Sequence, residues 1–564
     1  MKDSKAFPYI MGGIGALAVL LIGFYFFCPA INLQSLGFWV LIDIALIVFT
    51  LVSRLIIGSR QQVVIEKKPK FMKSILADRA ASAMFAPKYY IAPLILTGLI
   101  IFMAIIGATV FNAKGYADII EVKDGDFQKD IAESVGTDSI ALMDTASAQM
   151  LGDREIGALS DVVSQYDVSR DYSQIDYNGK PIKVAPLNYA GFFKWLNNKG
   201  RGITGYVTVD PVSMSGTFCK CEGMIYTPSA YFGEDATRYL RMKYPTLMFE
   251  NLHFEINEEG KPYYVASIVD KTIGVFGGKT VSGCIVLDPV SGETTKYDVE
   301  SIPRWIDVVF YGNLICEQYN WHGMYQNGFF NSIFAKKDCK QVTTYTAPED
   351  DETFDTPPVS DFGYIAKDGD IWIYTGITSV NGDSSNIGFL LANERTGESR
   401  YYAIAGADEK SAMAAAEGEV QEKGYQASFP SLINIEGHPT YIMVLKDSGG
   451  LVKLYATVNV EQYNIVTTAP TQTECIEKYK EILGIKDDDK EPDAEAEAVT
   501  KTVEILALRY IDIDGNTYIY LIDTEETIYK AKASKNENML LLKEGDKVVL
   551  TLKGSDIVEC KEVE

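Results

Sequence analysis

Three apolar stretches near the N-terminus constrain this chain more than any other feature of its sequence. They cover residues 8–28, 37–57 and 91–112, and each reaches the roughly 20 residues that a helix needs to cross the hydrocarbon core of a bilayer. The first is too long for the apolar part of a signal peptide, and no A-x-A cleavage site accompanies it. We therefore expect residues 1–112 to form a membrane anchor with three transmembrane helices.

Basic residues predict how this anchor is oriented. Seven Lys or Arg residues lie in the 58–90 loop and none lies in the 29–36 turn. The positive-inside rule then places the N-terminus and the 58–90 loop in the cytoplasm and everything from residue 113 onward outside. The sequence thus predicts a multi-pass protein of the plasma membrane with a C-terminal ectodomain.

Two features of the anchor allow more than one interpretation. Asp43 lies within the second stretch, and an acid inside a membrane is a candidate functional residue. It also lies beside Trp39 near the outer end, from where it could reach the headgroups instead. Gly12, Gly13 and Gly15 would let another helix approach closely, which is a weak indication of self-association.

The charge of the chain changes sign after the anchor. Residues 1–112 carry 10 Lys or Arg and 4 Asp or Glu, whereas the remainder carries 42 and 72. Such an acidic ectodomain repels phosphates, which argues against nucleic acid as a partner. We expect the acidity to keep the ectodomain soluble, and we expect the lipid bilayer itself as one partner.

A phrase of eleven residues occurs twice in the ectodomain. Residues 256–266 (INEEGKPYYVA) and 433–443 (INIEGHPTYIM) are identical at six positions, at a constant offset of 177. Each copy predicts a β-hairpin closed by a glycine turn, and their recurrence predicts an internal duplication. We expect a helical connector at 113–175, a first α+β repeat at 176–299, an aromatic-rich bridge at 300–365 and a second α+β repeat at 366–486.

The bridge allows two interpretations. Its aromatic residues could belong to an amphipathic helix pair that seals the two repeats together, or they could form an exposed groove for a peptide or glycan. They are Trp305, Phe310, Tyr311, Tyr319, Trp321, Tyr325, Phe329 and Phe330.

The C-terminal part predicts a spacer and a further small domain. Residues 487–500 (DDDKEPDAEAEAVT) lack the ligand pattern and the turn glycine of a calcium loop, so we expect an acidic, solvated linker. Residues 501–564 alternate apolar and polar side chains through five or six short strands. This pattern predicts a small β-barrel that resembles an OB-fold or an SH3-like domain.

The order of elements around the first copy of the phrase resembles a known family. A helix is followed by the hairpin that holds residues 260–266 (GKPYYVA) and then by residues 286–293 (VLDPVSGE). Together they resemble the PepSY domain family, although the second copy has Asn459-Val-Glu-Gln where the first has Asp288-Pro-Val-Ser. The resemblance implies a non-catalytic binding or inhibitory module on the outer face of a bacterial membrane, and it supplies no active site to carry over.

The sequence offers little chemistry. His253, His322 and His438 lie at non-equivalent positions of the two repeats, and no nucleophile elbow, zinc-protease motif or phosphate-binding loop is present. Seven of the eight cysteines lie beyond the membrane stretches, and we expect most of them to be reduced. We therefore expect no catalytic residues, no cofactor and no metal site. The binding residues remain open.

These features predict a non-enzymatic scaffold or regulatory protein of the bacterial cell envelope. Its partners would be envelope proteins or a second copy of itself. The alternative is a cell-surface receptor that binds a small molecule, peptide or glycan between the two repeats, which requires a deep apolar pocket there. An envelope hydrolase would require two carboxylates at catalytic separation in a pocket.

Overall fold

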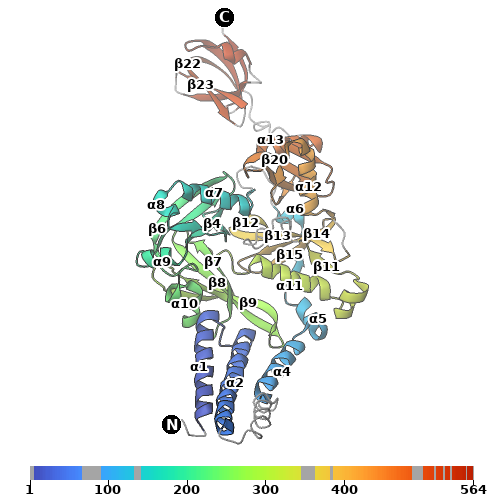
Figure 1. The fold of residues 1–564 in the computed structure, drawn as a ribbon. Helices are drawn as coiled ribbons and strands as arrows, with labels where there is room; N and C mark the ends of the chain where they lie inside the picture. Colours follow the sequence, from blue (N-terminus) through green and yellow to red (C-terminus); the bar gives the residue numbers. More distant parts are fainter. Residues whose placement is uncertain are drawn as a thin grey trace. The chain divides into compact units, whose positions relative to one another are not determined.

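The computed structural model describes residues 6–66, 90–131, 142–343, 362–381, 385–485, 499–513, 516–524, 527–533, 537–553 and 556–562. The chain divides into two compact units (Figure 1). The first comprises Met1–Leu451 and Val458–Asn464, and the second comprises Val452–Thr457 and Ile465–Glu564. The boundary falls within strand β20 (Val452–Asn459), inside the region predicted as the second repeat.

Two helices of the first unit are long and apolar enough to cross a membrane. They are α1 (Phe7–Phe27) and α2 (Leu36–Glu66), which lie side by side in Figure 1. Many of their apolar side chains are exposed, as is expected of surfaces that face lipid. Helix α2 extends into the predicted loop 58–90 as far as Glu66, and residues 67–89 of that loop lie outside the described residues.

The third predicted span is broken. Helices α4 (Ile91–Ile106) and α5 (Thr109–Ala117) meet at a bend of 45°, so a third span is present only if this bent pair counts as one. The Tyr116 hydroxyl donates a hydrogen bond of 2.7 Å to the Gly107 carbonyl, and the Asn112 amide donates one of 2.6 Å to the Ile106 carbonyl. These side chains satisfy carbonyls that the break removes from the helical ladder, which stabilises the bend.

Glycines set the distance between α1 and α2. A Cβ atom on Gly12 would lie 2.1 Å from Ser53 Oγ, and one on Gly23 would lie 2.3 Å from Leu41 Cδ1. A Cβ atom on Gly13 would meet no heavy atom within 4 Å. The small residues that the sequence associated with self-association are therefore used, at Gly12, for packing within one chain.

The Asp43 side chain is directed toward a neighbouring helix. It is 9% exposed, and its Oδ2 accepts a hydrogen bond of 2.6 Å from the Thr97 hydroxyl of α4. An acid in an apolar helix is costly unless it finds a donor, and Thr97 supplies one. Asp43 thus joins α2 to α4.

Three sheets, antiparallel except for one strand pair, follow the membrane helices in the first unit. The first has the order β2-β4-β5-β6, with β3 paired to β4, and the second has the order β7-β8-β9-β10. The third has the order β1-β15-β14-β13-β11, with β12 and β16 added, and its β1 pairs with β15 in parallel. Strands β17 and β18 then pair with β19. The strands are β1 (Val122–Asp124), β2 (Tyr166–Val168), β3 (Ser173–Tyr177), β4 (Lys180–Tyr189), β5 (Ile203–Asp210), β6 (Ser215–Met224), β7 (Phe249–Ile256), β8 (Pro262–Ile273), β9 (Gly277–Leu287), β10 (Thr294–Asp298), β11 (Lys340–Val342), β12 (Gly363–Lys367), β13 (Asp370–Ser379), β14 (Ser385–Asn393), β15 (Ser399–Tyr402), β16 (Gly406–Ala407), β17 (Gln426–Ala427), β18 (Ser431–Ile435) and β19 (His438–Lys446).

The structural repeat is a shorter unit than the two α+β repeats that the doubled phrase predicts. A hairpin, a third strand, a turn and a fourth strand recur along the chain at β3–β6, β7–β10, β12–β15 and β18–β21. At the end of each third strand, the side-chain oxygen of Asp210, Asp288, Asn393 or Asn459 accepts a backbone N–H two or three residues ahead. Such turns satisfy the backbone where the strand ends. This order of elements therefore occurs four times among the described residues.

The two copies of the phrase form hairpins with different turns. In β18–β19, Glu436 and Gly437 both have positive φ, 49° and 80°, which is the two-residue turn that matches strand twist. In β7–β8, the longer turn is held by Asn257 Oδ1, which accepts the N–H groups of Glu259 and Lys261. The register consequently differs by one residue between the copies.

Helices connect these strands, and several of them begin at an aspartate. The Asp144, Asp235 and Asp408 carboxylates accept the N–H three residues ahead at the starts of α7, α10 and α12. Segment 113–175, expected to be helical, also contains strands β1 to β3, and its residues 132–141 lie outside the described residues. The helices are α6 (Phe127–Asp130), α7 (Thr145–Gly157), α8 (Ser160–Val163), α9 (Phe192–Asn198), η3 (Phe232–Glu234), α10 (Ala236–Lys243), η4 (Val299–Ser301), α11 (Gly312–Tyr325), η5 (Asn331–Ala335), α12 (Glu409–Glu419) and η6 (Gln421–Lys423).

The aromatic bridge is not a pair of α-helices. Its described part forms the short η4, the α-helix α11 and η5, a single π-helical turn. Trp305 packs against Tyr263 of β8 with ring centroids 4.8 Å apart, and Tyr319 is 3% exposed. Phe330, by contrast, is 67% exposed. Tyr319 therefore belongs to the core and Phe330 to the surface, and the bridge is buried again at Val342 of β11 and at Phe362 before β12. The acidic residues 344–361 lie outside the described residues.

The second unit contains a closed barrel with the strand order β22-β23-β24-β26-β25. Its core is built from alternate strand residues such as Val503, Ile519 and Leu550. The predicted linker 487–500 lies outside the described residues except for Val499 and Thr500, which begin β22. The elements of this unit are β21 (Val466–Ala469), α13 (Gln472–Ile482), β22 (Val499–Ile513), β23 (Asn516–Asp523), β24 (Ile528–Lys532), η8 (Glu537–Leu541), β25 (Lys547–Lys553) and β26 (Asp556–Glu562).

Candidate functional site

The histidines that the sequence offers do not come together. His253 Nε2 lies 2.8 Å from Glu255 Oε1, His322 Nδ1 lies 2.9 Å from the Ala117 carbonyl, and His438 begins β19. All eight cysteines are free thiols. Within the described ranges, no group of three or more His, Cys, Asp or Glu residues could hold a metal ion.

A cluster of buried charged side chains lies instead in the first unit. It consists of Lys183 of β4, Glu255 of β7, Asp307 in the bridge and Glu394 at the end of β14. None is more than 2% exposed. Charged groups this deeply buried are rare unless they are paired or neutralised. We call these four residues the buried charge cluster.

Glu255 is the fixed member of the cluster. Its carboxylate accepts the backbone N–H groups of Asp307 and Val308 at 3.0 and 2.9 Å, and His253 contacts it from the same strand. The two backbone donors compensate this carboxylate for the loss of water. Glu255 thereby ties strand β7 to the bridge.

Asp307 and Glu394 are compensated less completely, although Asp307 Oδ2 accepts the backbone N–H of Asp176 at 2.8 Å. Burial and the nearby Glu255 raise the pKa of Asp307 well above its usual range, and burial and Glu255 raise the pKa of Glu394 to about 8. The backbone N–H of Gly312 and the charge of Lys183 oppose the shift of Glu394. Among the described residues, Asp307 Oδ1 and Glu394 Oε2 have no hydrogen-bond partner. At neutral pH, Glu394 is therefore a neutral carboxylic acid.

Lys183 supplies the positive charge of the cluster. Its Nζ donates to Thr145 Oγ1 at 3.2 Å and lies 4.9 Å from the centre of the Tyr364 ring. Thr145 belongs to α7 in the predicted connector, and Tyr364 belongs to β12 at the end of the predicted bridge. A buried ammonium over an aromatic face is attracted by the ring quadrupole. Lys183 therefore joins the first predicted repeat to the predicted connector and the predicted bridge.

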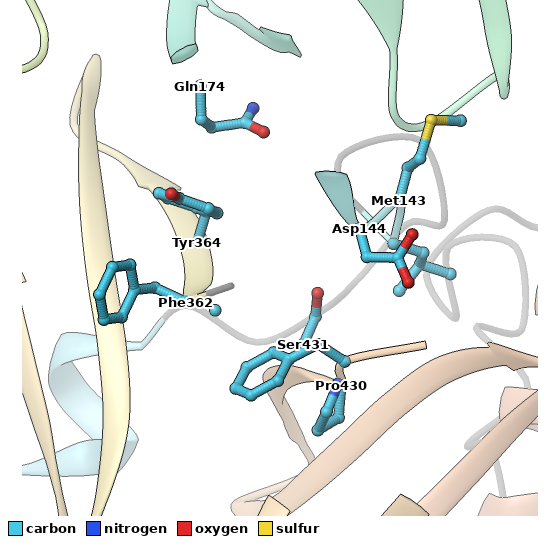
Figure 2. Close-up of a pocket in the computed structure, with 10 residues that line it drawn as sticks. Met143, Asp144, Gln174, Phe362, Tyr364, Pro430 and Ser431 are labelled. Carbon is cyan, nitrogen blue, oxygen red and sulfur yellow. The ribbon is translucent and has the colours of Figure 1, made fainter. Parts of the chain in front are cut away.

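A small cavity lies close to this cluster, lined by segments of the predicted connector, the predicted bridge and the second predicted repeat (Figure 2). Figure 2 shows Gln174 and Tyr364 on one side of the space and Asp144 on another, with Pro430 and Ser431 closing it further. Its volume is about 20 Å³, which accommodates roughly one water molecule. This cavity is far too small for the peptide or glycan that the receptor hypothesis requires. Its lining residues are Leu142, Met143, Asp144, Gln174, Phe362, Gly363, Tyr364, Phe429, Pro430 and Ser431.

An ion pair closes one wall of the cavity. Lys446 Nζ of β19 lies 2.6 Å from Asp144 Oδ2 and 3.1 Å from Ser147 Oγ. Burial alone would raise the pKa of Asp144, but the Lys446 charge and the hydrogen bonds from Lys446 and Ser147 hold it below its usual value. Asp144 also caps helix α7, so one carboxylate fixes both that helix and the hairpin of the second copy.

The buried charge cluster holds strands of the first unit and the bridge together, and its four side chains are closed to solvent. Sequence reasoning missed this cluster because its members are spread over more than 200 residues among 76 acidic side chains. One signal was available: the tetrapeptide Asp-Pro-Val-Ser occurs at both 210–213 and 288–291, which marks the shorter repeating element.

Comparisons with known proteins identify no family. No protein-family model matches the chain, and no curated protein matches it. The crystal structure of an ACO/RPE65 chimera is 8% identical over 71% of this chain, with a TM-score of 0.12. That of cobalt-substituted ACO from Synechocystis is 9% identical over 71%, with a TM-score of 0.13. This chain covers 62% and 65% of those chains.

Proposed function

We propose that this protein is a membrane-anchored, non-enzymatic scaffold or regulatory protein on the outer face of a bacterial plasma membrane. Its N-terminus lies in the cytoplasm, three spans cross the membrane with the bent α4–α5 pair as the third, and the sheets face outward. Envelope proteins or a second copy of the chain are its partners. The resemblance to PepSY domains is part of this proposal.

The observation that supports it is the attachment of the membrane helices to the sheets. Arg238 and Arg241 lie three residues apart on α10 and donate to the Tyr25 and Cys28 carbonyls at 2.9 and 2.8 Å. These are the terminal carbonyls of α1, which have no partner within the helix and favour cations. Direct hydrogen bonds therefore join α10, which lies among the sheets of the first unit, to the end of α1.

The turn between α1 and α2 strengthens this attachment. The Asn32 amide donates to the Thr246 carbonyl at 3.0 Å, and the Gln34 amide donates to the Lys271 carbonyl at 2.8 Å. The Ile31 N–H donates to the Pro245 carbonyl at 2.7 Å. A domain held at a fixed orientation to the membrane can present one surface to neighbouring envelope proteins, which is what a scaffold requires.

The test is the mass of the full chain extracted from its own membranes together with surrounding lipid, in polymer-bounded nanodiscs. One chain weighs 62.5 kDa, and the proposal predicts a protein mass larger than this by a partner or a second copy. The variant Arg241→Leu should lower the assembled fraction, whereas Lys296→Met, at an exposed surface pair, should not. A single chain with no copurifying protein would refute the scaffold.

A further inference from the structure

A group of exposed apolar side chains lies on α9 and around η3. Phe193 is 75% exposed and Phe232 is 54% exposed, with Phe192, Leu196 and Tyr231 between 37% and 43%. The Phe192 ring lies 5.1 Å from Tyr231 and 6.4 Å from Phe232, so the rings form one continuous surface. We call these five residues the aromatic patch. Soluble proteins rarely expose such surfaces without a use for them.

The backbone holds Phe232 outward at a cost. Its φ is 57°, in the left-handed region, which bulky residues avoid and which glycine occupies freely. The next residue is Gly233, which could adopt this conformation without strain, yet the left-handed position is occupied by Phe232. Neither burial nor turn preference accounts for a phenylalanine there, since more than half of its surface faces solvent.

The aromatic patch adjoins the end of α1. Arg238 joins the two: its Nη1 donates to the Phe232 carbonyl at 2.7 Å while its Nε donates to the Tyr25 carbonyl at 2.9 Å. The guanidinium also lies 4.7 Å from the centre of the Tyr25 ring. Tyr25 is in the last turn of α1, and Figure 1 places α10 directly at that end of the helix. The patch therefore begins where an apolar, membrane-length helix ends.

The charge around the patch is opposite to that of the chain. Residues 192–201 (FFKWLNNKGR) contain Lys194, Lys199 and Arg201 and no acidic residue, and with Arg238 these four basic residues outnumber Glu234 and Asp235 beside η3, although the chain carries a net charge of −24. Aromatic rings interleaved with basic side chains are the composition of surfaces that lie among anionic headgroups. The charge is therefore complementary to an anionic membrane surface.

We infer that the aromatic patch inserts into the headgroup region of the leaflet where α1 ends, and that its ligand is anionic phospholipid. Phe193 and Phe232 enter the boundary between headgroups and acyl chains, and Lys194, Lys199 and Arg201 contact the phosphates. Together with α1, the patch gives the first sheet a second point of attachment, which fixes its tilt. The inference rests on the proposed membrane anchoring.

The test uses the full chain in vesicles of phosphatidylcholine and phosphatidylglycerol with an environment-sensitive fluorescent amino acid at one position. The positions are 193 in the patch, 21 within α1 as the positive control, and 163 as the negative control. Val163 is 46% exposed on α8, which Figure 1 shows away from α1. Lipids carrying a quencher near the headgroup are then added. Quenching at 193 should be at least threefold that at 163, and should fall at least twofold when phosphatidylglycerol is omitted.

The controls separate failure of this inference from failure of the anchoring. Quenching at 21 by a quencher deep in the acyl chains, with 193 no more quenched than 163, would overturn the inference and leave the anchoring intact. No quenching at 21 would overturn both. Shielding of 193 from aqueous iodide without lipid quenching would indicate a protein partner and would also overturn the inference. In the variant Phe232→Gly, quenching at 193 should drop at least twofold while the melting temperature stays equal or rises.

Discussion

Replacing Glu394 with Gln should change how the stability of the protein depends on pH. Glu394 keeps its proton in the folded state up to a pKa of about 8, whereas in the unfolded chain it titrates at its ordinary value of 4.5. As pH rises from 4.5 to 8, only the unfolded state releases this proton, so the free energy of unfolding falls across that window. A neutral amide cannot titrate and abolishes this contribution.

The magnitude follows from the size of the shift. Each pKa unit corresponds to about 1.4 kcal/mol, so the wild type should lose on the order of 3 kcal/mol between pH 5 and pH 8 through this one group. Asp307, whose pKa is also raised, acts in the same direction in both proteins. The readout is therefore the difference between variant and wild type, which should grow with pH in favour of Glu394→Gln.

The assay is denaturant unfolding of the full chain in detergent micelles, followed by intrinsic fluorescence at several pH values from 5 to 8. Glu300→Gln, at an exposed glutamate in η4, is the matched control and should track the wild type at every pH. A difference between Glu394→Gln and wild type that stays constant over this range would show that Glu394 is ionised in the folded protein. The account of the buried charge cluster would then be wrong.

Three further substitutions test other contacts. Arg241→Leu leaves the Cys28, Tyr244 and Leu247 carbonyls without their shared donor and should lower the free energy of unfolding by about 3 kcal/mol, measured by denaturant midpoint; an unchanged midpoint would contradict the attachment of α1 to α10. Lys446→Met leaves Asp144 buried without its cation and should lower the free energy of unfolding by roughly 3 kcal/mol. Adding Asp144→Asn should recover part of this loss, and a double variant less stable than Lys446→Met would argue against the ion pair. Gly12→Ala should cost about 1–3 kcal/mol because its Cβ would overlap α2, whereas Gly13→Ala, in open space, should be neutral; equal melting temperatures for the two variants would exclude the close approach of α1 and α2.

Local signals in the sequence predicted local structure well. Two uninterrupted apolar stretches are helices of membrane length, and Asn178-Gly179 closes a hairpin because both residues tolerate positive φ. The sequence did not predict the break at Gly107. The break depends on Asn112 and Tyr116, whose side chains donate hydrogen bonds to the carbonyls that it frees. The composition of a span does not record such contacts.

The candidate site depended on tertiary structure throughout. Lys183 and Glu394 are separated by more than 200 residues, and nothing in their neighbouring sequence distinguishes them from exposed Lys and Glu residues. The doubled phrase was a true signal for two hairpins, but identical letters gave turns that differ in register by one residue. The residues around the shared glycine differ between the copies, with Lys261 in the position of His438 and Glu258 in that of Ile435. Gly260 and Gly437 therefore lie in two different turns.

The parallel pairing of β1 with β15 restricts the order in which the first unit can fold. Val122 pairs with Ser399, and the neighbouring Asp130 is bonded to Arg400 at 2.7 Å and to Tyr402 at 3.0 Å. During synthesis, the segment that leaves the bilayer first must therefore wait for nearly three hundred further residues before its partner strand exists. Until then, β1 has no partner strand on that edge, and an unpaired edge is open to pairing with other chains. The pairing of β1 is thus among the later steps in the folding of the first unit, after Tyr402 has been synthesised.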